Sequence, residues 1–245
     1  MQAKKRLDIV LVERGLETSR ARAQARILAG DVVVGEHRAD KAGYLVSDSD
    51  LIRLKDNSLP YVSRGGLKLE AALKAWPSQV QDAICIDIGA STGGFTDVLL
   101  QAGAKTVYAV DVGTNQLAYS LRIDPRVQVF EKTHILKVPV GTFEPKPTVA
   151  VIDVSFISLE KVLPAVLKHL AHPATIYALI KPQFEVGPGL IEKGGIVKNV
   201  AAREAARDKI LALAKNLGLE VRGHQESPIQ GADGNVEYLA CMFLR

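Results

Sequence analysis

Apolar runs of strand length alternate with helix-like segments along most of the chain. Largely apolar runs occupy residues 83–88, 106–110, 127–130, 149–152 and 176–180. Segments between them carry apolar residues every three or four positions, which is the spacing of one helix face. Continuous apolar strands are typical of parallel sheets that helices cover on both faces. The pattern therefore predicts an α/β domain in which strands and helices alternate.

A long helix and two further strands are predicted nearer the C-terminus. Apolar positions between residues 201 and 217 indicate a helix that ends at Gly218, and a strand starts at residues 219–223. Residues 235–244 form the final strand, after a loop rich in glycine, proline and aspartate. If that strand runs antiparallel to the others, it begins at the edge where they end. This topology would bring Glu237 to that edge.

The first 55 residues follow a different pattern, which predicts a compact α+β unit. Leu7 and Leu11 lie at helical spacing, and Ser19 can cap a second helix that ends at Gly30. Three short strands follow, at residues 32–34, 44–46 and 51–54. A polar stretch that ends in proline comes next and has the composition of a linker. We therefore expect a domain boundary within residues 56–60.

Composition limits the class of protein. The chain has 245 residues, of which 47% are hydrophobic, so it can bury one large core and one small one. No apolar run approaches the roughly 20 residues that span a bilayer, and no signal-peptide pattern begins the sequence. We expect a cytoplasmic protein that does not associate with membranes. Cys85 and Cys241 lie in apolar runs, which predicts buried thiols rather than a disulfide.

Basic side chains gather in residues 4–26. This segment holds seven lysines and arginines against three acidic residues, although the net charge of the chain is only +4. Many surface helices carry arginines for solubility alone, and charge by itself favours that interpretation slightly. The order of the residues adds a second signal, in the segments Arg6-Leu7-Asp8, Ser19-Arg20-x-x-Ala23 and Ile27-x-x-Gly30-x-Val32-x-Val34.

These segments resemble the S-four RNA-binding domain, in which two helices and a β-turn form a basic, RNA-facing surface. The resemblance covers about residues 6–55. It implies RNA contacts by five basic residues, namely Arg6, Arg20, Lys41, Arg22 and Arg26, the last two as neutralisers of phosphate charge.

The strand at 83–88 breaks into a turn that opens a helix, with glycine at positions 89, 93 and 94. Glycine permits positive φ angles and close approach of the backbone to a ligand, and the first N–H groups of a helix offer hydrogen-bond donors. The spacing G-x-x-x-G-G differs from the G-x-G-x-x-G of a pyrophosphate-binding turn. We interpret the turn as a site for a nucleoside without phosphates.

Charged residues end the other strands at the same predicted edge of the sheet. Asp111 ends the second strand, where a carboxylate can accept hydrogen bonds from both hydroxyls of a ribose. Asp153 ends the fourth strand and Lys181 the fifth, and ligands of open parallel sheets bind beyond such ends. Arg64 and Lys68 share a helix face beside a Gly-Gly pair, which suits an anionic or hydroxyl-bearing substrate. One charged residue at a strand end is often an ordinary surface group, but several at one edge favour a site.

Five motifs in this order resemble those of the TlyA-type ribosomal RNA 2′-O-methyltransferases, a group often labelled haemolysin A, whose catalytic domain is similar to the FtsJ class. The motifs are Ser63-Arg64-Gly65-Gly66-x-Lys68-Leu69, Asp87-x-Gly89-Ala90-Ser91-Thr92-Gly93-Gly94-Phe95-Thr96, Asp153-x-Ser155-Phe156-Ile157-Ser158-Leu159, Lys181-Pro182-Gln183-Phe184-Glu185 and Asn235-Val236-Glu237-Tyr238. The resemblance implies a Rossmann-like class I methyltransferase fold, with a seven-stranded, mostly parallel sheet whose last strand is antiparallel. It also implies an S-four-like domain at residues 1–58, a linker at 59–62 and the methyltransferase domain at 63–245.

The same resemblance implies S-adenosylmethionine as the cofactor and ribosomal RNA in ribosomal subunits as the partner, without a metal or an obligate protein partner. The catalytic residues that it implies are Lys68, Asp153, Lys181 and Glu237. The cofactor-binding residues are Asp87, Gly89, Ala90, Ser91, Thr92, Gly93, Gly94, Phe95, Asp111 and Asp153. Arg64 joins Arg6, Arg20, Arg22 and Lys41 as an RNA-binding residue.

Transfer of a methyl group to a ribose 2′-hydroxyl requires removal of the hydroxyl proton as the new bond forms. A lysine can accept that proton when neutral, or polarise the oxygen as a cation, and carboxylates beside it orient the amine. We expect Lys181 in this role, with Asp153 and Glu237 holding it and Lys68 binding the hydroxyl or a phosphate. Added side chains at the turn glycines are expected to obstruct the cofactor, and the glycine-rich stretch at 185–197 could act as a lid.

Two other functions stay open. The haemolysin label suggests a membrane-active protein, which the lack of a spanning segment disfavours. An RNA-binding protein with an inactive methyltransferase domain is disfavoured by the four intact catalytic residues. The chain begins almost at Arg6 and stops after its last strand, as in short forms of the family, so we expect a cytidine ribose of large-subunit RNA as the target.

Overall fold

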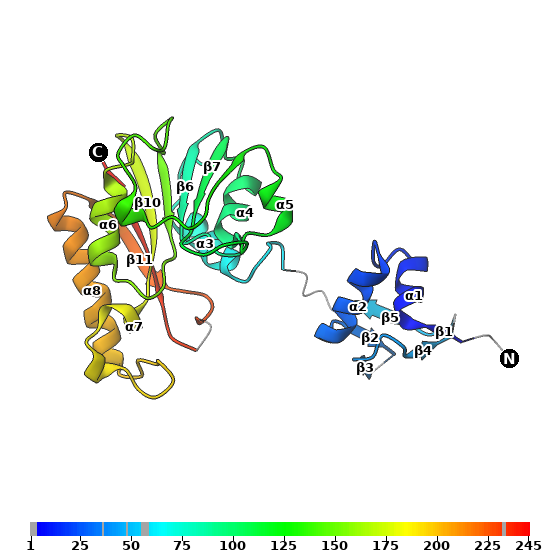
Figure 1. Cartoon of the computed structure of the whole chain (residues 1–245). Helices are drawn as coiled ribbons and strands as arrows, with labels where there is room; N and C mark the ends of the chain where they lie inside the picture. The colour runs from blue at the N-terminus through cyan, green and yellow to red at the C-terminus, as the bar shows by residue number, and fades with distance from the viewer. Residues whose placement is uncertain (1–3, 36, 48, 55–58, 232–233) are drawn as a thin grey trace. The chain divides into compact units, whose positions relative to one another are not determined.

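The computed structural model describes residues 4–35, 37–47, 49–54, 59–231 and 234–245. Contacts between residues divide the chain into two compact units, Met1–Leu59 and Pro60–Arg245 (Figure 1). The boundary expected after residue 58 falls beside residues 55–58, which lie outside the described residues. The domain limits therefore stay predictions, and each unit is described by itself.

The described residues of the first unit form two helices and five short strands. Its helices are α1 (Leu7–Glu13) and α2 (Arg20–Ala29). Its strands are β1 (Lys5–Arg6), β2 (Val32–Val34), β3 (His37–Ala39), β4 (Leu45–Val46) and β5 (Ile52–Leu54). The strand order β3-β2-β5 is antiparallel, and β1 pairs separately with β4. Leu7, Leu11 and Ile27 are fully buried between helices and strands, so a small apolar core holds this unit together.

Local signals set the limits of α2 as the sequence predicts. The side chain of Ser19 caps the helix by accepting a hydrogen bond from the Arg22 N–H at 3.3 Å. Gly30 ends the helix in the left-handed region, with φ at +75°. Both signals place the basic residues of α2 on a helix whose ends are fixed.

The second unit contains a seven-stranded sheet between helices. Its strands are β6 (Ile84–Ile88), β7 (Thr106–Val110), β8 (Val127–Phe130), β9 (Val149–Ile152), β10 (Ala174–Ile180), β11 (Glu220–Glu226) and β12 (Tyr238–Leu244). Its α-helices are α3 (Gly65–Ala75), α4 (Gly94–Gln101), α5 (Tyr119–Arg122), α6 (Leu159–Leu167), α7 (Pro182–Glu185) and α8 (Val200–Asn216). Two short 3₁₀ helices are η1 (Ile135–Lys137) and η2 (Pro188–Leu190).

The order of the strands is β11-β12-β10-β9-β6-β7-β8. Strand β12 pairs antiparallel with both β10 and β11, whereas β6 to β10 pair in parallel. The chain moves outward from β6 to β7 and β8, then returns to β9 on the other side of β6. This reversal opens a crevice at the carboxyl ends of β6 and β9, where open α/β sheets bind ligands.

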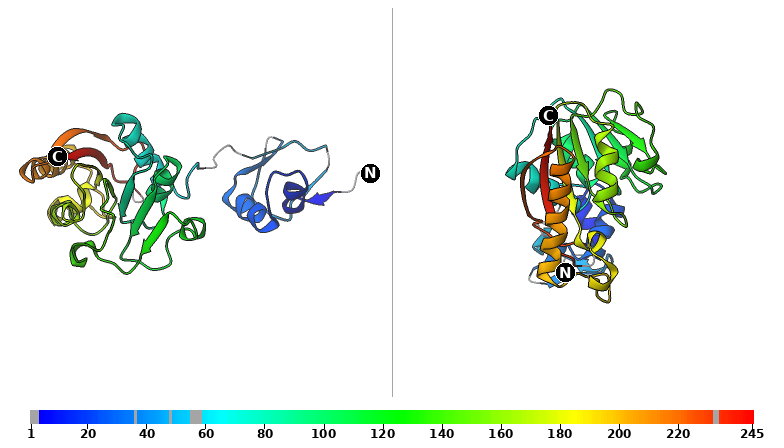
Figure 2. Two further views of the ribbon diagram at one scale, coloured as in Figure 1. Left: turned by 90° about the horizontal axis from the view of Figure 1, so that it is seen from above. Right: turned by 90° about the vertical axis from the view of Figure 1, so that its left-hand side faces the viewer.

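Helices cover the two faces of this sheet (Figure 2). Ile86 and Ile88 point toward α6 and α8, while Cys85 on the same strand points toward α3 and α4. All seven residues of β10 are buried, as expected of a strand covered on both faces. The sheet is therefore packed on both faces, and its carboxyl edge carries the candidate site.

The predicted elements of this unit are confirmed, with differences at their ends. The last strand begins at Tyr238 rather than at residue 235, and β11 extends to Glu226. Part of the expected loop at 185–197 is ordered into η2 and a bridge between Glu192 and Ile196. The four-residue helix α7 also went unpredicted, because it is too short to show a periodic pattern.

Candidate active site

The glycine turn joins the end of β6 to the start of α4. Gly89 has φ at +88°, a backbone conformation that favours glycine. A Cβ atom there would lie 2.3 Å from the Asp153 carbonyl oxygen at the end of β9. Gly89 thus lets the ends of β6 and β9 approach each other, and that approach shapes the bottom of the crevice.

The other two glycines of the turn also make room for the protein itself. A Cβ at Gly93 would lie 2.2 Å from a methyl group of Leu121, and one at Gly94 would lie 2.3 Å from Ser63 Oγ. The expectation that added side chains obstruct the cofactor stays a prediction, and the structure adds a second effect of such substitutions. A side chain at any of the three glycines first collides with neighbouring protein atoms, because the turn is packed on its outer side.

Asp111 lies at the end of β7 and is tied to the glycine turn. Its Oδ2 accepts a hydrogen bond from the Ser91 N–H at 2.7 Å, and its Oδ1 accepts one from the Gly113 N–H at 2.6 Å. Each carboxylate oxygen has a second lone pair, so the group can still accept hydrogen bonds from a ligand. The two contacts fix the orientation of the acid that was expected to bind a ribose.

A cavity of about 120 Å³ adjoins the turn. It is lined by Ser63, Gly65, Gly89, Ala90, Ser91, Thr92, Gly94, Phe95 and Asp153. Seven of the predicted cofactor-binding residues thus line one cavity at the carboxyl edge of the sheet. Gly93 packs behind this cavity against leucine side chains.

Asp87 is fully buried within β6. Its Oδ2 accepts a hydrogen bond from the Thr96 hydroxyl at 2.7 Å, but Oδ1 has no hydrogen-bond partner among the described residues. Burial above all, together with the nearby Asp153, raises the pKa of Asp87 to about 7 against the lowering effect of Thr96. A buried acceptor without a partner at the base of the turn is a group that a bound ligand or water can satisfy.

The four predicted catalytic residues meet beside a larger pocket of about 470 Å³. The Lys181 ammonium lies 2.6 Å from Asp153 Oδ1 and donates a hydrogen bond to Ser155 Oγ at 2.9 Å. The Lys68 ammonium donates to Glu237 Oε2 at 2.5 Å. Lys68, Lys181 and Glu237 line the pocket itself. The structure therefore holds two lysine–carboxylate pairs at one edge of the sheet.

This pairing corrects one expectation about the site. Glu237 was expected to help Asp153 hold Lys181, whereas it pairs with Lys68 on α3. The Lys68 and Glu237 side chains are only 9% and 3% exposed, so this pair is almost completely withdrawn from water. The Lys181 and Asp153 side chains are 11% and 21% exposed, and Lys181 faces the pocket.

Aromatic residues of the same pocket went unassigned in the sequence. Phe156 is 92% exposed and has φ at +63°, a region that non-glycine residues rarely adopt. Its ring lies 5.3 Å from the ring of Phe184, which in turn lies 6.0 Å from Lys181 Nζ. Both residues stand in recognised motifs, but a motif does not show that an aromatic ring projects into solvent.

Arg64 and Gln183 also line the pocket, and Arg64 is exposed at the N-cap of α3. The contact of Arg64 with an anionic substrate stays a prediction.

Two buried polar residues hold the loops around the pocket. The Glu185 carboxylate accepts hydrogen bonds from the Ser158 hydroxyl and the Leu159 N–H, which joins α7 to the start of α6. Burial raises the pKa of Glu185. The Asn235 side chain accepts from the Val197 N–H and donates to the Gly195 carbonyl oxygen. Asn235 thereby ties the 187–197 segment to the residues just before β12, which include Glu237.

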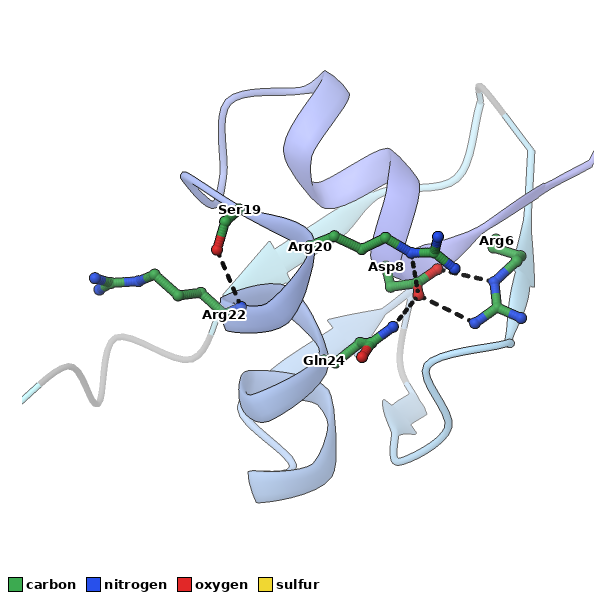
Figure 3. A network of polar contacts seen from close by, with 6 residues as sticks. All are labelled: Arg6, Asp8, Ser19, Arg20, Arg22 and Gln24. Carbon is green, nitrogen blue, oxygen red and sulfur yellow. Dashed lines mark hydrogen bonds and ion pairs between the residues drawn. The ribbon is translucent and has the colours of Figure 1, made fainter.

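In the first unit, the predicted RNA-binding arginines are held by two buried acids. Arg6 and Arg20 both pair with Asp8 (Figure 3). Arg22 and Arg26 pair with Glu17. Lys41 is exposed, in the turn between β3 and β4. Each of these two carboxylates thus holds two of the predicted arginines. Neither carboxylate was identified from the sequence as their partner.

The described ranges contain neither a cluster of metal ligands nor a helix that could span a membrane. Within residues 4–35, 37–47, 49–54, 59–231 and 234–245, no group of three histidine, cysteine or acidic side chains is placed to hold a metal ion. No helix in this part of the chain combines the length and the apolar composition that crossing a membrane requires. Cys85 and Cys241 are both buried and free, as predicted.

Comparison with known proteins assigns both units to families. The FtsJ-like methyltransferase family matches residues 61–243, and the S4 domain family matches residues 5–52. "Putative rRNA methyltransferase YqxC" of Bacillus subtilis is 48% identical over 96% of this chain and 84% of its own length. "16S/23S rRNA (cytidine-2'-O)-methyltransferase TlyA" of Mycobacterium tuberculosis is 43% identical over 97% of this chain and 89% of its own. A solved structure named "Putative hemolysin from Streptococcus thermophilus" is 46% identical, with a TM-score of 0.76 over 100% of this chain and 90% of that one.

Proposed function

The chain belongs to the TlyA-type family, an S4 domain followed by an FtsJ-like methyltransferase domain, and from that premise we propose that it methylates ribosomal RNA. The reaction is transfer of a methyl group from S-adenosylmethionine to the 2′-oxygen of a cytidine ribose. The observation that carries the proposal is the meeting of Lys181, Asp153, Lys68 and Glu237 at one pocket, beside the glycine turn. Because ribosomal subunits are the proposed substrate, we also propose a cytoplasmic location.

The residues of the turn fit S-adenosylmethionine in chemistry. The oriented Asp111 carboxylate would accept hydrogen bonds from the ribose hydroxyls of the cofactor. Residues 89–92 would hold its methionine part in the adjoining cavity, above the buried Asp87 oxygen that lacks a partner. When bound, the cofactor supplies a methyl group on a positively charged sulfur, which leaves as a neutral thioether.

Lys181 would act on the hydroxyl of the substrate. In its neutral form the Lys181 amine accepts the proton of the 2′-hydroxyl, while a lone pair of that oxygen forms the new bond to the methyl carbon. Asp153, 2.6 Å from the amine, orients Lys181 and stabilises the ammonium that results. Release of that proton to water would then prepare the next cycle.

Lys68 and Glu237 would position the substrate rather than take its proton. Glu237 holds the Lys68 ammonium at the wall of the pocket, where it can bind the hydroxyl or a neighbouring phosphate of the RNA. Phe156, whose exposed ring packs against the half-buried Phe184, adds aromatic surface to the same pocket, suited to stacking a nucleobase that has left its helix. Most of the rate should come from holding the 2′-oxygen in line with the methyl group.

We propose large-subunit RNA as the target, consistent with the part of the M. tuberculosis relative's name that refers to 23S RNA. The test incubates the purified protein with radiolabelled S-adenosylmethionine and separate large and small subunits from cells that lack the protein. Label is expected in the large subunit, in an alkali-resistant dinucleotide, because a 2′-O-methyl group removes the nucleophile of alkaline cleavage. Label on a base, or none in either subunit, would overturn the proposal.

The hemolysin name of a relative motivates one further assay. Dye-loaded liposomes should stay intact with the protein at concentrations that saturate methyl transfer. Dye release at those concentrations would favour a membrane-active function.

A further inference from the structure

Asp8 occupies an unusual position beneath the basic surface of the first unit. Its side chain is completely buried at the start of α1. It accepts hydrogen bonds from Arg6 Nε and Nη2 at 3.0 Å each, from Arg20 Nε at 3.0 Å and from Gln24 Nε2 at 2.7 Å. Figure 3 shows this carboxylate between the two arginines, which approach it from different elements.

The contacts with Asp8 occupy only part of each guanidinium group. Arg6 pairs through two nitrogens and Arg20 through one, so the remaining nitrogens can bind other groups. The Arg6 and Arg20 side chains are 44% and 56% exposed, although their partner is buried. Arg6 also lies over the backbone of Gly43, where a Cβ atom would be 3.6 Å from its Nη1. Both guanidinium groups are therefore fixed on their inner side and open on their outer side.

An acid at this place has an electrostatic cost for RNA binding. A negative charge beneath a surface that attracts phosphates weakens the long-range attraction. The gain is order, because an unrestrained arginine loses much rotamer freedom when it grips a phosphate. An arginine that is already held in place loses less, so each contact contributes more to binding.

We propose that Asp8 is a positioning residue that fixes Arg6 and Arg20 as a pair of phosphate-binding groups for the RNA backbone. This inference rests on the proposed function in ribosomal RNA methylation. It goes beyond it by assigning a role to an acidic residue that does not itself touch RNA. If the ordering of the arginines dominates, removal of the Asp8 carboxylate weakens RNA binding. If its negative charge dominates, removal strengthens RNA binding, so an experiment can separate the two effects.

The first test compares two neutralising substitutions in the full-length protein. Asp8→Asn is expected to weaken binding to large ribosomal subunits by about five- to tenfold, since two ordered phosphate contacts are lost. Glu13→Gln is the matched control, because exposed Glu13 pairs with Lys5 in the same unit without holding either arginine. It should leave binding unchanged or slightly tighter. Binding by Asp8→Asn as tight as that of Glu13→Gln would overturn the proposal.

The second test conserves charge and covers the possibility that Asp8→Asn unfolds the unit. Arg6→Lys and Arg20→Lys keep the positive charge but lose the planar fork that grips Asp8. Each should weaken binding about threefold and lower the slope of log affinity against log salt by about one. Arg53→Lys, an exposed change on β5, is the control and should alter neither quantity. Lysine variants that bind like the wild type would contradict a role for fixed geometry.

Two readouts separate this role from a structural one and from failure of the proposed function. In an Arg6→Ala, Arg20→Ala background, Asp8→Asn should tighten binding slightly, since only its charge effect remains. In methyl transfer, Asp8→Asn should raise KM and leave kcat unchanged. Weakened binding by Asp8→Asn in that background as well would overturn the inference alone. No binding of subunits by the wild type would overturn the proposed function together with it.

Discussion

Both units of this protein hold positive side chains with carboxylates, but they differ in how much of each pair is buried. In the first unit the carboxylate of Asp8 is buried, and the arginines that it holds are about half exposed. In the second unit both members of the Lys68–Glu237 pair are buried, and Lys181 opens only into a pocket. The first arrangement presents charge to a large partner, and the second encloses charge around a small reacting group.

The choice of cation matches this difference. Arginine stays protonated in proteins and offers several donors in one plane, so it binds phosphates without taking part in proton transfer. Lysine carries one compact charge and can lose its proton when its surroundings favour the neutral form. Under the proposed function, the same ion-pair chemistry would serve recognition in one unit and reaction in the other.

Replacement of lysine by arginine at position 181 should give the largest effect, a loss of methyl transfer. Lys181→Arg keeps the positive charge but cannot accept the hydroxyl proton, and we expect kcat to fall by about 10³-fold. Affinity for S-adenosylmethionine, measured by calorimetry, should stay within about twofold. A variant that retains a tenth of the activity would show that Lys181 acts only through its charge, which would remove the distinction between the units.

Loss of one member of the buried Lys68–Glu237 pair should give the second largest effect, a loss of stability. Glu237→Gln leaves the Lys68 ammonium buried without its counter-ion, and should lower the free energy of unfolding by about 3 kcal/mol. Lys68→Met combined with Glu237→Leu should recover most of that stability without restoring methyl transfer. Glu70→Gln, in the exposed pair with Lys74, is the control and should cost less than about 1 kcal/mol. Urea unfolding followed by Trp76 fluorescence measures all three, and equal costs for the two glutamates would contradict the account.

The smallest effect concerns how acid changes the stability of each unit. Hydrogen bonds from Arg6, and then from Gln24 and Arg20, hold the pKa of Asp8 well below its ordinary value, although burial opposes them. Its contribution to stability is therefore present above about pH 4 and is lost as the pH falls toward the folded-state pKa. Asp87 has the opposite shift, to about 7, because it is buried with few donors. Its contribution should fall between pH 4 and pH 7, because the unfolded state releases in this range the proton that the folded state retains.

Asp8→Asn and Asp87→Asn should therefore change the pH dependence of stability in opposite directions. The protein is equilibrated in urea at pH 3 to 8 and then labelled by a pulse of hydrogen exchange at one fixed pH. The label measures the unfolded fraction of each unit separately. Asp8→Asn should flatten the loss of stability of the first unit below pH 4. Asp87→Asn should flatten the decline of the second unit up to pH 7. A change of the same sign in both variants would contradict the assignment of their environments.

The sequence predicts the sheet and the edge that carries the site, because these follow from periodicity. Five apolar runs each correspond to a parallel strand, and the acids and lysine after them lie at one edge, as parallel topology requires. Gly30 and Ser19 also mark helix ends as expected, because capping depends on residues close in sequence.

The partners of the charged residues could not be predicted, because they depend on contacts between distant segments. Glu237 is 169 residues from Lys68, and no local pattern shows that it pairs there rather than with Lys181. Asp8 reads as an ordinary acid near a helix start, and only the fold brings Arg20 and Gln24 to it. The positions of the turn glycines follow from the sequence. The side chains and backbone of other elements that lie beside them do not.

We propose above all that Lys181 accepts the proton of a ribose 2′-hydroxyl of large-subunit RNA while S-adenosylmethionine supplies the methyl group. The most direct measurement maps methylated riboses in ribosomal subunits from cells that lack the protein, with complementation by the wild type or by Lys181→Ala. The account predicts one cytidine 2′-O-methyl group in large-subunit RNA that disappears in the deletion strain, returns with the wild type and stays absent with Lys181→Ala. Its return with Lys181→Ala at equal protein level would contradict the account.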